Sequence, residues 1–181
     1  METIFWIGSN WFLLLFVIAI CTTIAKARRL STPQLGDIAY IAWGELLVYS
    51  VGVWLIYAGI GHAYFQEVTA PRIGWQPSPF QFELGWMEIP LGFVAIAALW
   101  RGYEFRLAST TIVATFSLAC AAQHIQQMIC CGNYSPNNAG PILWFADIFV
   151  PSLLLCLAAL SGSRDTAGEA AHSRSARIIA E

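Results

Sequence analysis

The sequence predicts an all-α integral membrane protein, a bundle of about five transmembrane helices. Of the 181 residues, 57% are hydrophobic and only 11% are charged, and the mean hydropathy is +0.60. Soluble domains carry about 25% charged residues, so most of this surface does not need to meet water. The formal net charge of −2 leaves no basic stripe for phosphates, which argues against nucleic acid as a partner. The expected partner is the lipid bilayer.

Five stretches are long and apolar enough to cross the hydrocarbon layer, which takes about 20 residues. They cover residues 4–25, 38–61, 84–100, 108–128 and 141–160. The third is the shortest and contains Glu88 and Pro90. After them the composition changes to Ser, Gly, Ala and mixed charge, which is typical of disorder. We therefore expect one bundle over residues 1–160 and a disordered cytoplasmic tail over residues 161–181.

The basic residues predict the orientation of the bundle. Glu2 precedes the first apolar stretch and Lys26, Arg28 and Arg29 follow it, which is the reverse of a cleaved signal peptide. If these three lie in the cytoplasm, eight of the nine Lys and Arg residues do so, and only Arg72 lies outside. Such a bias is expected of cytoplasmic loops. The sequence therefore predicts a multi-pass protein of the inner (cytoplasmic) membrane, with its N-terminus outside and its C-terminus inside.

Polar side chains gather in the outer half of this predicted bundle. Ionisable groups within a bilayer are costly and usually face a bundle interior or a polar cavity. Counting about 1.5 Å per residue from the helix ends places carboxyls, imidazoles and amides in one layer. The proposed ligand-binding or proton-relay residues are His62, Gln81, Glu83, Glu88, Gln123, His124, Gln127 and Asp147. The candidate metal ligands, expected in one polar pocket, are His62, Glu83, His124 and Asp147.

Several chemical uses of these groups stay open. Carboxylates and imidazoles together suit Fe, Mn or Zn, and they also suit a proton relay or a quinone head group. No Glu-x-x-His, His-x-x-x-His or Cys-x-x-Cys pair marks a metal site on one helix. His62 is alternatively an interfacial residue, and His124 part of an interhelical hydrogen-bond network. Glu45 lies toward the inner half, where we expect it to pair with a tyrosine or tryptophan donor.

Four segments carry a resemblance to known proteins. They are YAGIGHAYFQEV, IGWQPSPFQFELG, PLGFVAIAALW and FRLASTTIVATFSLACAAQHI. Over about residues 38–128 the chain resembles an uncharacterised family of small bacterial integral membrane proteins with an IGW…SPFQFE signature, and more distantly DoxX-like proteins. The DoxX-like resemblance implies a four-helix membrane bundle, in some cases associated with quinone, thiol-redox or terminal-oxidase systems. On the matching residues it favours His62, Gln81, Glu83 and His124, and the stretch 4–25 would be an addition.

The leading functional hypothesis is a pocket in the outer half that binds a metal or a small redox ligand such as a quinone. The first alternative is a small ion-coupled transporter with Glu88, His124 and Asp147 as the relay. Five helices offer no inverted repeat, so transport would require an oligomer. The second alternative is a non-catalytic subunit or assembly factor, whose partners would be further copies of the chain or other membrane subunits. The sequence does not decide whether the protein is an enzyme.

Overall fold

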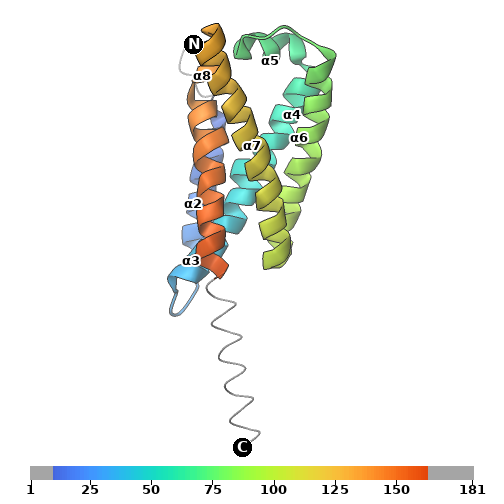
Figure 1. Ribbon diagram of the computed structural model, residues 1–181. Coiled ribbons are helices and arrows are strands. Elements are labelled where there is room, and N and C mark those ends of the chain that lie inside the picture. The colour runs from blue at the N-terminus through green and yellow to red at the C-terminus, as the bar shows by residue number, and fades with distance from the viewer. Residues whose placement is uncertain (1–9, 163–181) are drawn as a thin grey trace, which may run out of the picture.

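A computed structural model describes residues 10–162, and the elements in this part of the chain are all helices (Figure 1). In chain order they are α2 (Trp11–Ala27), α3 (Leu35–Leu46), η1 (Leu47–Val53), α4 (Trp54–Tyr64), α5 (Gln66–Ile73), α6 (Pro79–Ala97), η2 (Ala98–Trp100), α7 (Tyr103–Cys131), α8 (Pro136–Ala139) and η3 (Ile142–Phe149). The segments η1 and η3 are wider π-helical stretches, and η2 is a 3₁₀ turn. The helix that contains η3 continues to Gly162.

Four helices are long and apolar enough to cross a membrane: Leu35–Tyr64, Pro79–Trp100, Tyr103–Cys131 and Pro136–Gly162. The expectation of a helical bundle with membrane-length apolar helices is therefore confirmed. The helix α2 is apolar but has 17 residues, so the count of five spans stays a prediction. Residues 4–9 of the first expected span, and residues 163–181 of the expected tail, lie outside the described residues.

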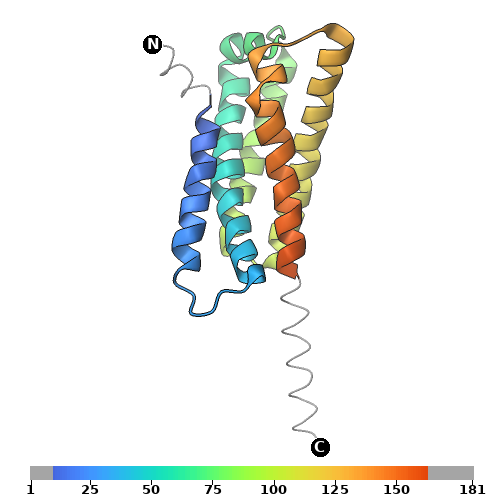
Figure 2. The same ribbon diagram turned by 90° about the vertical axis from the view of Figure 1, so that its left-hand side faces the viewer.

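The long helices lie side by side along one bundle axis (Figures 1 and 2). Short helices α5 and α8 lie at the end where α2 begins, which we call the α5 end. The last helix reaches Gly162 at the opposite end, where a Cβ on Gly162 would lie 2.7 Å from the hydroxyl of Tyr103 at the start of α7. We call this end the Arg106 end. In Figure 2 the helices α2, α3 to α4 and the last helix are seen next to one another.

Glycines bring α4 and α6 into backbone contact. A Cβ built on Gly59 would lie 2.7 Å from the carbonyl oxygen of Gly85, and one on Gly92 would lie 2.7 Å from that of Gly52. Small residues at a helix interface let two backbones approach closely and are a usual means of packing in membranes. The pairs Gly59–Gly85 and Gly52–Gly92 therefore fix how close α6 lies to the helix Leu35–Tyr64.

The Arg106 end is tied together by polar contacts. The buried Arg106 guanidinium donates to the carbonyl oxygens of Ala98 (2.9 Å), Leu99 (2.8 Å) and Tyr40 (3.0 Å), and thus caps the carboxyl end of α6. The buried Glu45 pairs with Lys26 of α2. The expectation that Glu45 would find a tyrosine or tryptophan donor is therefore wrong, because a lysine one helix earlier reaches it.

Apolar packing fills this half of the bundle. The fully buried Trp43 donates from Nε1 to Thr110 Oγ1 at 2.7 Å. Around it lies a core of buried side chains that includes Leu46, Leu47, Ala95, Ala98 and Leu154. Side chains in such a core interdigitate and leave few voids. The half of the bundle toward the α5 end, by contrast, contains a cavity.

Candidate functional site

A cavity of about 680 Å³ lies between the long helices in the half toward the α5 end. Its wall is formed by side chains of α4, α6, α7 and η3, and α5 contributes further side chains at that end of the bundle. Ligand sites in proteins usually have volumes of about 300 to 1,000 Å³. The cavity therefore has the size of a small-molecule site.

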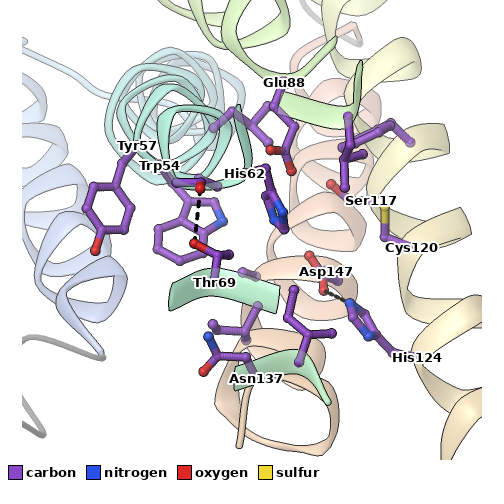
Figure 3. A pocket seen from close by; sticks show the side chains of 18 of the residues that line it. Trp54, Tyr57, His62, Thr69, Glu88, Ser117, Cys120, His124, Asn137 and Asp147 are labelled. Carbon is purple, nitrogen blue, oxygen red and sulfur yellow. Dashed lines mark hydrogen bonds and ion pairs between the residues drawn. The ribbon is translucent and has the colours of Figure 1, made fainter. Parts of the chain in front are cut away.

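Each of the four surrounding helices contributes one acidic or imidazole side chain to the wall. They are His62 from α4, Glu88 from α6, His124 from α7 and Asp147 from η3. Figure 3 shows the Glu88 carboxyl beside the His62 ring, and Asp147 facing His124. The structure thus brings together four of the residues that the sequence placed in one layer.

The His62 ring is held by a neighbouring amide. Its Nδ1 lies 2.5 Å from Oε1 of Gln81, and both side chains are buried. Since the amide oxygen only accepts hydrogen bonds, Nδ1 carries the proton of this bond. Nε2 is then the acceptor nitrogen of the neutral ring. Gln81 itself does not line the cavity, so it positions His62 from behind.

His124 is held in the same way by Asn138. The amide NH₂ of Asn138 donates to the carbonyl oxygens of His124 (3.2 Å) and Asn133 (2.8 Å). Its Oδ1 must therefore be the atom that accepts from Nδ1 of His124, at 2.8 Å. Nε2 of His124 lies 3.9 Å from Oδ2 of Asp147, and Trp75 stacks on the ring at 5.9 Å with an interplanar angle of 18°.

Three buried polar atoms of the wall have no hydrogen-bond partner: Ser50 Oγ, Glu88 Oε2 and Gln123 Oε1. Native proteins leave few buried polar groups unsatisfied, because each costs about 1 to 3 kcal/mol. Ser50 lies in η1 and Asp147 in η3, so both π-helical stretches carry a polar residue of the wall. Such stretches occur often at functional sites.

The rest of the wall is apolar and aromatic, and so is the rim. Trp54, Trp75 and Phe116 line the cavity. Among the lining residues, Tyr57, Val68 and Phe80 are also exposed, by 50%, 57% and 64%. Exposed apolar side chains on a membrane-length bundle are the ones that meet lipid. The rim is therefore suited to a molecule that arrives from the hydrocarbon phase.

Besides Gln81, two further residues proposed from the sequence do not line the cavity. Glu83 is exposed on α6, and neither it nor Gln127 lines the wall. Glu83 precedes Glu88 by five residues, about 140° around an ideal helix, and α6 is regular over both. Glu83 therefore points away from the wall that Glu88 joins.

The structure also adds residues that the sequence did not single out. Asn138 and Ser50 are buried polar residues of the site. Trp75, which stacks on His124, is a further residue of the wall. The sequence signal for Asn138 was its place in an Asn-rich turn just before the last apolar stretch, where a side chain that bonds backbone carbonyls is common.

The metal hypothesis receives no geometric support from this arrangement. Among residues 10–162, no three His, Cys, Asp or Glu side chains are grouped so that they could hold a metal ion. Glu83, one of the four candidate ligands, is turned outward. The His62, Glu88, His124 and Asp147 side chains line an open volume instead.

Comparison with known proteins gives a match to the model of a protein family. The model of a family of unknown function, DUF6790, matches residues 9–167. No curated protein and no solved structure matches the chain, so the likeness to DoxX-like proteins stays a prediction. Since the family model spans most of the sequence, including all the residues of the site, the chain belongs to the DUF6790 family.

Proposed function

We propose that the protein is an integral membrane protein that binds a small lipid-soluble ligand in the cavity. The observation that carries this proposal is the cavity itself, with an apolar wall, a few polar groups deep in the bundle and an exposed apolar rim. Ligand sites have this composition, because apolar walls supply most of the affinity and a few polar groups fix the orientation. The ligand's polar head would lie between the pairs His62–Glu88 and His124–Asp147.

The ligand head should carry hydrogen-bond donors. In their neutral forms His62 and His124 both offer Nε2 as an acceptor, since each Nδ1 is bound to an amide oxygen. The unpartnered atoms of Glu88 and Gln123 are also oxygens that accept hydrogen bonds. Of the redox ligands expected from the sequence, a quinol, which has hydroxyl groups, fits this set better than a quinone, which has only carbonyl oxygens.

The charge distribution supports an orientation in which the cavity lies in the outer half of the membrane. Of the six Lys and Arg residues in the described part of the chain, five lie toward the Arg106 end, namely Lys26, Arg28, Arg29, Arg101 and Arg106, and such a bias marks the cytoplasmic side. Arg72 of α5 is then the exception. In a bacterial inner membrane, the cavity would face the periplasmic leaflet.

Ion-coupled transport is a second candidate, because Glu88 and Asp147 are ionisable groups within membrane-length helices. The packed core at the Arg106 end stands against an open path in this conformation. Proton-driven flux into proteoliposomes, with Glu88→Gln for comparison, tests this candidate. Equal flux in both proteins would remove Glu88 from a relay. A role as a subunit of a larger membrane complex stays a prediction.

Filling the cavity tests the proposed function. Ala146 lines the cavity, whereas Ala122 of α7 is exposed and does not. In phosphatidylcholine nanodiscs, dodecylamine and decylhydroquinone serve as probes, and thermal unfolding is the readout. At 100 times the Kd, a bound probe stabilises the folded state by about 2.7 kcal/mol.

We expect a saturable rise in Tm with at least one probe for the wild-type protein and for Ala122→Phe. Ala146→Phe should lose it, since the phenyl ring takes up part of the volume. If neither probe gives a saturable rise, or if Ala146→Phe responds like the wild type, the cavity is not a ligand site.

A further inference from the structure

The charged groups of the cavity wall are mainly acidic. Glu88 of α6 and Asp147 of η3 both line it. Arg72 of α5 is the basic side chain among the described lining residues. It belongs to the covering helix, whereas the two carboxyls belong to membrane-length helices. The deep part of the cavity therefore holds two acidic groups without an adjacent lysine or arginine among the described lining residues.

Glu88 is incompletely satisfied, and the ion-pair partner of Asp147 is distant. Glu88 is only 7% exposed, and its Oε2 has no hydrogen-bond partner although it borders the cavity. Asp147 has its imidazole neighbour at 3.9 Å, which is longer than a hydrogen bond. A buried carboxylate without a compensating charge or donor is costly. An ammonium cation placed between Glu88 and Asp147 would supply a compensating positive charge and hydrogen-bond donors.

Aromatic rings surround the same space. Trp54 and Tyr57 come from α4, Trp75 from the chain after α5, and Phe116 from α7. Figure 3 shows the Trp54 indole at the cavity near His62 and Thr69. The face of an aromatic ring attracts an ammonium group, most strongly when water is excluded. The carboxyls and the aromatic rings thus both favour a positively charged ligand.

We infer that the ligand is a lipid-soluble cation, an amine or ammonium group carried on an apolar chain or ring. This inference rests on the proposed function, since it names the class of molecule that the cavity binds. The ammonium lies between Glu88 and Asp147, with His62 Nε2 and Gln123 Oε1 as further acceptors for its N–H groups. The apolar part lies against the aromatic wall and leaves through the exposed rim toward the lipid.

Matched single-chain probes test the sign of the charge. In phosphatidylcholine nanodiscs, dodecylammonium, dodecyltrimethylammonium and neutral dodecanol share one chain length and differ in the head group. Because this lipid has no net charge, it does not concentrate the cations by itself. We expect both cations to bind at least tenfold more tightly than dodecanol, measured as the change in tryptophan fluorescence from Trp54 and Trp75.

The matched variants are Glu88→Gln in the cavity and Glu83→Gln, which is exposed on the same helix. Glu88→Gln should weaken dodecylammonium binding at least tenfold and leave dodecanol binding unchanged, while Glu83→Gln should change neither. The Tm of Glu88→Gln without probe reports folding. If this variant does not fold, Asp147→Asn is measured against the same expectations.

Three results would overturn the inference, and the first of them separates it from the proposed function. If dodecanol or decylhydroquinone binds as tightly as the cations, and Ala146→Phe still abolishes that binding, the ligand is neutral and the cavity function stands. If no probe binds saturably to the wild-type protein, both proposals fail. Equal losses in Glu83→Gln and Glu88→Gln would show that the effect is one of general surface charge.

Discussion

The contact between α4 and α6 offers a sharp test of the fold, because it depends on the absence of a single atom. A Cβ on Gly85 would meet the carbonyl oxygen of Gly59, and it would lie 2.6 Å from the backbone nitrogen of Ala63 and 2.8 Å from its Cβ. Carbon contacts are favourable at about 3.5 to 4.0 Å. In Gly85→Ala the two helices must therefore move apart by about 1 Å, since the obstructing atoms belong mainly to the backbone.

The size of the effect follows from two opposing terms. Overpacking of this kind costs about 1 to 3 kcal/mol, whereas replacing a mid-helix glycine by alanine returns about 0.5 to 1 kcal/mol. The net expectation is a loss of about 1 to 2 kcal/mol in the free energy of unfolding. For a chain of this length, that corresponds to a fall in Tm of about 2 to 8 °C.

Thermal unfolding of purified protein in detergent micelles, followed by circular dichroism at 222 nm, measures this shift. Gly102→Ala is the matched control, because a Cβ there meets nothing within 4 Å. The double variant Gly59→Ala/Gly85→Ala should lose less than the sum of the single variants, since one separation relieves both contacts. A Tm for Gly85→Ala at or above that of Gly102→Ala would show that the contact between α4 and α6 tolerates a Cβ at this position.

Three further predictions concern the polar contacts. Arg106→Lys should lower the free energy of unfolding by about 2 kcal/mol or more, because a lysine ammonium cannot donate to all three carbonyl oxygens as the planar guanidinium does. An unchanged denaturation midpoint would contradict this. In ¹⁵N spectra, His124 should be the Nδ1–H tautomer when neutral, and Asn138→Ala should mix the two tautomers; a pure Nε2–H signal in the wild type would disprove the assignment. Lys26→Met should cost about 1 to 2 kcal/mol by leaving Glu45 buried and unpaired, and adding Glu45→Gln should recover most of that loss in the same unfolding measurement.

The depth of a polar residue in the bundle was predictable from the sequence. His62 lies in the last turn of α4, and Glu88, His124 and Asp147 lie within about three turns of a helix end, where the rise per residue is nearly constant. Counting from the predicted ends was therefore enough to place them in one layer. The hydropathy pattern and the alternation of helix direction are enough to predict the depth of a residue.

The side of the helix on which a residue lies was less predictable. Glu83 lies in the same layer as the site but on the exposed side of α6. Its offset of five residues from Glu88 corresponds to about 140° around an ideal helix, so the two side chains point in different directions. In the last helix the rotation per residue also changes at η3, because Pro151 lacks an N–H and its ring obstructs the carbonyl of Asp147. A count of 3.6 residues per turn does not describe that stretch.

Partners from distant segments were not predictable from helix patterns at all. Glu45 pairs with Lys26 across 19 residues, and His124 with Asn138 across 14. Either contact depends on how two helices are rotated against each other, which the close glycine packing and the loop geometry decide. The sequence offered only the rule that a buried charge needs a partner, and it did not say which one.

The distribution of unsatisfied atoms separates the roles of the two halves of the bundle. Of five buried side-chain atoms without a partner in the described part of the chain, three border the cavity. At the Arg106 end, by contrast, the buried Arg106, Trp43 and Glu45 side chains all have partners. Defects of packing would be scattered, whereas unsatisfied groups at one void are expected where a ligand completes them. The half at the Arg106 end therefore stabilises the fold. The half with the cavity keeps polar groups without partners for a ligand to bind, and the stability of the rest of the structure offsets the free energy that they cost.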